Sequence, residues 1–379
     1  MKKFCMFIVM LSCSLVLVKA QDMKMLVDSL KKIYAPDSRT SVWNVECIET
    51  YKAWKLKGEV DNDNKKATIL AETVKLGVNI VDSIVVLENS MEKPWGLVML
   101  SIASLRTDGR HAAEMATQAI MGTPVKLLQK KGDWYRVQTP DNYISYIPGN
   151  SIKRISESQL LKWKNSVRYI VTAYQSRLVE KPGSDATVSD LVLGNILEYK
   201  GKKGKWIELS TPDGRSGYLP ASDVKEFSEW SRQKFNANVI ESTARRMMGS
   251  GYLWGGTSTK VTDCSGLAKV CYFANGIILQ RDASQQALYG RRMKPAEWKS
   301  AKCGDLVFFG TSTGRVTHVG IYLRGGKYIH CSGRVKINSV DTSASDYLST
   351  PFLSISRIDG EIDTPGIVAV RNHSWYFDK

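Results

Sequence analysis

The sequence predicts an α+β protein built from several small domains. Its 379 residues exceed the length of one ordinary domain, and its 43% hydrophobic and 24% charged residues are typical of globular proteins. Short strand-like segments recur at a fixed spacing in the middle of the chain, and a helical segment followed by strands occupies the last third. These observations favour separate β-barrel and α+β domains over one large fold.

Residues 1–20 have the features of a secretory signal peptide. Two lysines follow the first methionine, residues 4–18 are apolar, and small or aliphatic side chains precede a cleavage position after Ala20. A buried N-terminal helix and a lipoprotein cut before Cys13 are the alternatives. We therefore expect export to the periplasm or the cell envelope.

The charge balance indicates an anionic partner. The formal net charge is +16 at pH 7. Since export argues against a nucleic acid, an anionic envelope polymer or its fragments is the expected partner. No apolar run reaches about 18 residues, so stable membrane insertion is not expected.

Outside the predicted signal peptide the number of cysteines is odd, so at least one thiol stays free if the others pair. They are Cys47, Cys264, Cys271, Cys303 and Cys331. These are too few for a disulfide scaffold, which leaves a thiol available for chemistry.

Residues 21–92 predict a small α+β domain with a packing or spacer role. Helical and strand-like patterns alternate in it. We expect helices near 22–34 and 64–76 and strands near 41–48, 53–60 and 79–87.

Residues 95–155 and 166–227 repeat each other with a shift of 72 residues. Short alternating strands and tight Pro-Asp turns in each copy are typical of a small β-barrel. The pattern resembles the bacterial SH3-like domain, which binds wall peptides or shapes a neighbouring active site. The aligned identities are Gly122 with Gly194, Lys130–Gly132 with Lys202–Gly204, Trp134 with Trp206, Thr139–Asp141 with Thr211–Asp213, Tyr146 with Tyr218, and Pro148 with Pro220.

The segment 232–360, followed by a tail at 361–379, contains a candidate nucleophile. Apolar residues recur with helical spacing after the run Asp263-Cys264-Ser265-Gly266, and Asp263 suits the N-cap. Cys264 then lies in the first helical turn, where free N–H groups and the helix dipole stabilise a thiolate and a developing oxyanion.

Two histidines on neighbouring predicted strands supply a base. His318 can take the thiol proton, and His330 can orient His318 through its other ring nitrogen. Both rings share a face only if the loop at Gly325-Gly326 has an odd number of residues or a bulge, so that paired residue numbers sum to 650. We predict that register.

Two other interpretations remain open for these residues. They could be ordinary core residues, or Cys264, Cys331, His318 and His330 could bind zinc. No CxxC, HxH or HExxH spacing supports the zinc site, and His330 and Cys331 alternate across one strand.

The ordered motifs Y-x-W-G-G, D-C-S-G, D-L-V-F-F, T-H-V-G-I-Y and Y-I-H resemble those of the NlpC-type cell-wall cysteine peptidases. The resemblance covers about 130 residues and implies a papain-like catalytic domain. It implies that Cys264 is the nucleophile, His318 the base and His330 the orienting residue. No cofactor is implied.

Two barrels ahead of such a domain resemble the γ-D-glutamyl-L-diamino acid endopeptidases of the dipeptidyl-peptidase VI type. The resemblance implies that carboxylates of Asp282 and Glu114, with Tyr143, hold the free ammonium of an N-terminal L-Ala. The second barrel has Arg215 in place of Tyr143. Residues implied to line the D-Glu site are Tyr252, Trp254, Asp263 and Ser265.

We therefore expect a peptidase that cuts the γ-D-Glu–diamino acid bond of murein stem peptides during wall-peptide recycling and releases L-Ala-D-Glu. The diamino acid could be Lys or diaminopimelate. An endopeptidase anchored to polymeric wall and a non-catalytic wall-binding protein are the alternatives.

Overall fold

The computed structural model describes residues 22–378, and the chain divides into two compact units after Pro94. The predicted signal peptide, residues 1–20, lies outside the described residues. Within the described part, no helix has both the length and the apolar character needed to cross a membrane.

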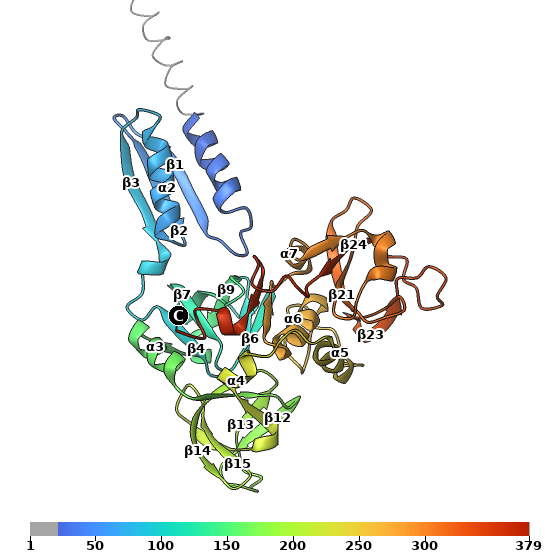
Figure 1. The fold of residues 1–379 in the computed structure, drawn as a ribbon. Coiled ribbons are helices and arrows are strands. Elements are labelled where there is room, and N and C mark those ends of the chain that lie inside the picture. The colour runs from blue at the N-terminus through green and yellow to red at the C-terminus, as the bar shows by residue number, and fades with distance from the viewer. Residues whose placement is uncertain (1–21, 379) are drawn as a thin grey trace, which may run out of the picture. The chain divides into compact units, whose positions relative to one another are not determined.

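The first unit is a three-stranded sheet with two helices (Figure 1). The strand β1 is antiparallel to β2, and β2 is parallel to β3 through the crossover helix α2. Met23 and Val27 of the first helix and Ile69 of α2 share one core, so both helices cover the same face. The elements are a helix over 22–34, β1 (Trp43–Glu49), β2 (Trp54–Val60), α2 (Asp63–Val74), β3 (Ile80–Val86) and η1 (Leu87–Asn89). The predicted pattern of helices and strands is confirmed.

The second unit begins with what we call the first barrel, a seven-stranded antiparallel sheet over 95–155 with the order β10-β4-β7-β8-β9-β5-β6. Its elements are β4 (Trp95–Val98), β5 (Ile102–Arg106), β6 (Met115–Ile120), β7 (Pro124–Lys131), β8 (Trp134–Gln138), β9 (Ile144–Pro148), η2 (Gly149–Ser151) and β10 (Ile152–Ile155). The helix α3 (Glu157–Asn165) follows, started by a capping box between Ser156 and Gln159.

The second barrel, over 168–226, repeats this sheet with the order β13-β12-β16-β15-β14-β11-β17. The two copies of the sequence repeat have the same strand register. Trp134 lies opposite Pro148 in the first barrel, and Trp206 lies opposite Pro220 in the second. Its elements are β11 (Arg168–Val171), β12 (Gln175–Val179), β13 (Thr187–Val192), β14 (Ile196–Lys203), β15 (Trp206–Ser210), β16 (Ser216–Pro220), η3 (Ala221–Asp223) and β17 (Val224–Glu226).

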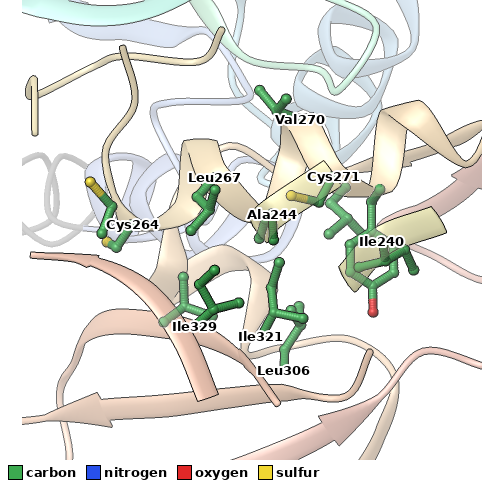
Figure 2. Close-up of a cluster of buried hydrophobic side chains, with 14 of the residues drawn as sticks. Ile240, Ala244, Cys264, Leu267, Val270, Cys271, Leu306, Ile321 and Ile329 are labelled. Atoms are coloured by element: carbon green, nitrogen blue, oxygen red, sulfur yellow. The ribbon is translucent and has the colours of Figure 1, made fainter. Parts of the chain in front are cut away.

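The last part of the second unit is a six-stranded sheet, ordered β19-β24-β20-β21-β22-β23, with helix α6 packed on one face. Figure 2 shows Leu267 and Cys271 of α6 above Ile321 and Ile329 of the sheet. Cys271 is fully buried, as its helical spacing predicts. This packing fixes the start of α6, and therefore Cys264, beside the sheet.

The helices of this part are α4 (Phe227–Ser231), α5 (Ala237–Arg246), α6 (Cys264–Ala274), α7 (Ala283–Gln286), η4 (Pro295–Ser300) and η5 (Val370–Asn372). Its strands are β18 (Ile277–Leu279), β19 (Arg291–Met293), β20 (Leu306–Gly310), β21 (Val316–Tyr322), β22 (Lys327–Ser332), β23 (Arg334–Ser339), β24 (Phe352–Arg357) and β25 (Ile367–Ala369).

The residues expected to form a C-terminal tail continue the fold. The strand β25 pairs with β18, and the last residues run back to the first barrel (Figure 1). There Trp375 packs edge-on against Trp95, with ring centroids 4.9 Å apart. The carbonyl of Tyr376 accepts a 2.9 Å hydrogen bond from Arg168 of the second barrel. Apolar and aromatic side chains at 370–377 therefore complete the core of the second unit.

Candidate active site

Cys264 is the first residue of α6, as predicted. Asp263 is the N-cap, and its carboxylate accepts a 2.7 Å hydrogen bond from the N–H of Gly266. The N–H groups of Val319, beside His318 on β21, and of Ser265 lower the pKa of the Cys264 thiol, so both act on the sulfur. The thiol therefore lies between the start of α6 and the strand that carries the predicted base.

Burial governs the protonation of this thiol. Burial, and after it the Asp263 carboxylate, raise the pKa of Cys264 to about 11. The two N–H groups and Arg281 lower the pKa but do not outweigh burial. The expected stabilisation by the helix N-terminus is present, yet the resting side chain is a neutral thiol at neutral pH.

The two histidines share a face through the predicted register. Ile321 lies opposite Ile329 and Tyr322 opposite Tyr328, so paired numbers sum to 650. The glycines of the loop, Gly325 and Gly326, have φ of 59° and 77°, in the left-handed region. His318 Nε2 therefore lies 2.7 Å from His330 Nδ1, which confirms the predicted juxtaposition.

His318 is a neutral imidazole at neutral pH. Burial, and after it the nearby His330 and the Lys336 ammonium, lower its pKa to about 3. Burial also lowers the pKa of His330, while its hydrogen bond with Asn338 acts in the opposite direction. A neutral imidazole beside a neutral thiol can remove the thiol proton as the sulfur attacks.

Arg281 is the part of the site that sequence reasoning missed. Its guanidinium is 1% exposed and forms a two-pronged ion pair with Asp263, at 2.5 and 3.2 Å. Nη1 of Arg281 also donates a 2.9 Å hydrogen bond to Ser265, and Nε donates one of 2.9 Å to Thr117 of the first barrel. The sequence shows Arg281 beside Asp282 but gives no signal for its pairing with Asp263, which lies 18 positions earlier in the chain.

These bonds use most of the hydrogen-bonding capacity of Asp263 and Ser265. Asp263 also accepts from the N–H of Gly255 at 3.0 Å, and Ser265 donates to Asp263 at 3.2 Å. Both side chains are buried. Their contacts hold the loop and Arg281 in place beneath the thiol.

Tyr143 and Asp282, two of the residues expected to hold an ammonium, are in contact. The Tyr143 hydroxyl donates a 3.1 Å hydrogen bond to the Asp282 carboxylate, across the junction of the first barrel and the catalytic domain. Arg281 lies 4.0 Å from the other oxygen of Asp282. Glu114 is exposed just before β6, and within 22–378 its carboxylate forms no hydrogen bond or ion pair.

The remaining predicted residues lie on the loop before α6. Tyr252 is partly buried and donates its N–H to the Gly333 carbonyl at 2.9 Å. Burial raises the pKa of Tyr252, and the nearby Cys264 and Asp263 add to this effect, so Tyr252 is a neutral hydrogen-bond donor. Trp254 is 61% exposed.

The arrangement does not assemble the alternative zinc site. The thiol of Cys331 donates to the Thr262 carbonyl at 3.4 Å, on the opposite face of β22 from His330. Among residues 22–378, no group of three His, Cys, Asp or Glu side chains could hold a metal ion.

Comparison with known families identifies two parts of the chain. Residues 249–357 match the model of the NlpC/P60 family. Residues 105–152 match the bacterial dipeptidyl-peptidase Sh3 domain. The first match contains the thiol and both histidines, and the second contains Tyr143 and Glu114.

Relatives in several bacteria carry related names. The chain is 27% identical to Dipeptidyl-peptidase 6 of Lysinibacillus sphaericus over 65% of this chain and 91% of that protein. It is 29% identical to the Gamma-D-glutamyl-L-lysine dipeptidyl-peptidase of Bacillus subtilis, over 56% and 71%. A probable endopeptidase of Haemophilus influenzae is 34% identical, over 32% and 73%.

A solved structure shares the fold. The crystal structure of an NlpC/P60 family protein from Bacillus cereus superposes with a TM-score of 0.61 at 20% identity. The match covers 70% of this chain and 99% of that chain. At this identity the likeness establishes the α+β fold alone.

Proposed function

Because the chain belongs to the NlpC/P60 family of cysteine peptidases, we propose that it hydrolyses the γ-D-Glu–L-diamino acid bond of murein stem peptides with a free N-terminal L-Ala. The observation that supports the proposal is the contact between Tyr143 and Asp282 at a domain junction, where Arg281 lies between Asp282 and Asp263, the residue before the thiol. The names of the relatives, which include γ-D-glutamyl-L-lysine dipeptidyl-peptidase, support the same bond.

The chemistry begins with attack of Cys264 on the γ-carbonyl of D-Glu. As the S–C bond forms, the thiol proton moves to the neutral imidazole of His318. The N–H of Cys264 at the start of α6, a position that has no acceptor within the helix, stabilises the oxyanion. The tetrahedral intermediate then expels the amine of the diamino acid, which takes the proton from His318.

A thioester of L-Ala-γ-D-Glu remains on Cys264 after this step. Water attacks the thioester carbonyl while His318 takes one of its protons. The S–C bond breaks, the proton returns to the sulfur and L-Ala-D-Glu leaves. One water is consumed per bond, and the enzyme returns to the neutral thiol and imidazole.

The ammonium of L-Ala binds at Asp282, with Tyr143 holding the carboxylate in place. Glu114 lies at the rim of the first barrel, where it adds a second negative charge. A neutral acetylated N-terminus cannot donate the charge-assisted hydrogen bonds that this pocket needs. The Arg281 guanidinium lies 4.0 Å from the Asp282 carboxylate and partly balances its negative charge before the substrate binds.

The D-Glu residue lies between the thiol and this pocket. The Tyr252 hydroxyl donates a hydrogen bond directly to D-Glu, and Trp254 covers the side of D-Glu that faces solvent. Asp263 and Ser265 act through Arg281, because the protein itself uses their polar atoms. We place this reaction in the periplasm or cell envelope, as part of wall-peptide recycling.

The test uses the protein without residues 1–20 and its Cys264→Ala variant. Each is mixed with L-Ala-γ-D-Glu-L-Lys, with its diaminopimelate analogue and with the N-acetylated forms, and mass spectrometry measures L-Ala-D-Glu release. We expect release from the free peptides only, with kcat/KM at least about 100-fold lower for acetylated peptides, and none from Cys264→Ala.

A matched pair of variants distinguishes the effect of the ammonium pocket from the effect of a change in net charge. Asp282→Asn should remove most of the preference for the free N-terminus, while Asp185→Asn, an exposed position in the second barrel, should not. Equal cleavage of free and acetylated peptides would instead indicate an endopeptidase of polymeric wall. Absence of cleavage would contradict the proposed substrate and favour a wall-binding protein.

A further inference from the structure

The amide of Asn338 ends a chain of hydrogen bonds behind the proposed base. His318 Nε2 lies 2.7 Å from His330 Nδ1, and His330 Nε2 lies 2.9 Å from Asn338 Oδ1. His330 is fully buried and Asn338 is 9% exposed. His330 therefore cannot replace a lost partner with bulk water.

The backbone of the next loop fixes which way this amide faces. Asn338 Nδ2 donates a 2.7 Å hydrogen bond to the carbonyl of Asp346. A backbone carbonyl only accepts, so the NH₂ group must face it and Oδ1 must face His330. The loop is held there by the N–H of Ser339, which donates to the same carbonyl at 3.3 Å. The side chain of Asp346 is held by an ion pair with Lys327, at 2.6 Å.

The orientation of the amide determines the proton on each ring. An amide oxygen only accepts, so His330 carries its proton on Nε2 and has a lone pair on Nδ1. That lone pair accepts the Nε2 proton of His318, which leaves a lone pair on His318 Nδ1 for the thiol proton. The same bonds remain satisfied when His318 becomes an imidazolium during the reaction.

A reversed amide would reverse every proton in the chain. Its NH₂ group would donate to His330 Nε2, and His330 would then donate from Nδ1 to His318 Nε2. The proton of His318 would move to Nδ1, the nitrogen that must accept from Cys264. The base would then be in the wrong tautomer. In the Ser-His-Asp triad, a histidine in the wrong tautomer lowers kcat by about 10⁴-fold.

We infer that Asn338 is a positioning residue that, oriented by the Asp346 carbonyl, keeps His318 in the tautomer able to deprotonate Cys264. The inference rests on the proposed roles of Cys264 and His318. It does not require a particular peptide substrate.

The experiment compares Asn338→Leu and Asn338→Asp with the full protein and with the control Asn275→Leu. Asn275 is an equally buried asparagine of the same domain, with its amide bonded to the backbone of Asn236 and Lys234. It lies at the opposite end of α6 from Cys264. The control therefore has the same change of side chain and a similar loss of hydrogen bonds without touching the histidines.

Two readouts do not depend on the substrate. NMR of protein labelled with ¹⁵N-histidine reports which ring nitrogen carries the proton, and the rate of Cys264 alkylation by iodoacetamide reports deprotonation of the thiol. Hydrolysis of L-Ala-γ-D-Glu-L-Lys between pH 4 and pH 9 is the third readout.

We expect Nε2–H tautomers at both histidines in the unmodified protein and in Asn275→Leu. Asn338→Leu should lose the single tautomer at His330 and lower kcat and the alkylation rate at least about 10-fold, with KM within about twofold. Asn338→Asp keeps the acceptor for His330 and adds a negative charge but loses the donor to the Asp346 carbonyl. Its activity should lie between those of Asn338→Leu and the unmodified protein, and its acid limb should shift to higher pH.

An Nδ1–H tautomer at His318 in the unmodified protein would overturn the inference. So would Asn338→Leu with unchanged tautomers, alkylation rate and pH profile. If the tautomers are as expected but L-Ala-γ-D-Glu-L-Lys is not cut, the proposed substrate fails while the role of Asn338 stands.

Discussion

At the scale of single residues, the site combines a buried neutral thiol, that of Cys264, with a half-buried neutral imidazole, that of His318. Burial raises the pKa of Cys264 to about 11 and lowers the pKa of His318 to about 3. Each group is thereby kept in its uncharged form. The proton transfer then occurs as the sulfur attacks, and the acid limb of activity reports His318.

Lys336 provides the first prediction. It lies directly opposite His330, and its ammonium lowers the pKa of both His318 and His330. Replacing the ammonium in Lys336→Gln should raise the pKa of His318, so the acid limb of kcat/KM should move to higher pH by up to about one unit. A pH series of kcat/KM measures the shift.

The control for this prediction is Lys200→Gln in the second barrel, which removes the same charge at an exposed position. It should leave the limb unchanged. A shift of equal size in both variants would show that net charge alone acts, and a shift to lower pH in Lys336→Gln would contradict the assigned cause.

At the scale of elements, the loop before α6 depends on a close approach to the first barrel. Gly255 has φ of +81°, and an added Cβ would lie 2.6 Å from the Met115 carbonyl oxygen. Its N–H also donates to Asp263. The glycine is therefore required both by conformation and by lack of space.

Gly255→Ala should lower the free energy of unfolding by about 2 kcal/mol or more, and it should lower activity because Asp263 and Arg281 shift. Gly249→Ala is the matched control, since Gly249 has φ of +82° with no neighbour within 4 Å. Urea unfolding of the two variants separates conformational strain from the clash. Equal losses of stability would mean that the contact with Met115 does not matter.

The sequence predicts the local parts of the site well and the distant parts poorly. Helical spacing after an N-cap predicts α6, and the sharing of a face by His318 and His330 predicts the hairpin register. These signals lie within a few residues of each other. The partners of Arg281 lie in the first barrel and in the loop before α6, and Asn338 is oriented by a loop carbonyl, so no periodic pattern marks them.

At the scale of the whole molecule, each unit has its own core, and the second unit is held together by its last residues. Trp375 contacts Trp95 of the first barrel, and His373 Nε2 lies 2.9 Å from the Pro140 carbonyl. A buried ion pair between Lys269 of α6 and Asp141 of the first barrel, at 2.6 Å, adds a second connection. The barrel that carries Tyr143 is thereby fixed against the thiol.

Tyr376 tests this account of the second unit, because it is 2% exposed within the shared core. Tyr376→Ala should lower the free energy of unfolding by about 3–5 kcal/mol, whereas Tyr376→Phe keeps the ring and should lose much less. Hydrogen exchange should then accelerate together in β8, β15 and β21. Acceleration confined to residues near Tyr376 would contradict a shared core.

The most direct test of the central claim is capture of the covalent intermediate. The protein is mixed with L-Ala-γ-D-Glu-L-Lys, quenched in acid within the first turnover and analysed by intact and peptide-level mass spectrometry. The account predicts an L-Ala-γ-D-Glu acyl group on Cys264, absent from Cys264→Ala and from reactions with the N-acetylated peptide. An adduct on another residue, an adduct that contains the lysine, or product formation by Cys264→Ala would contradict it.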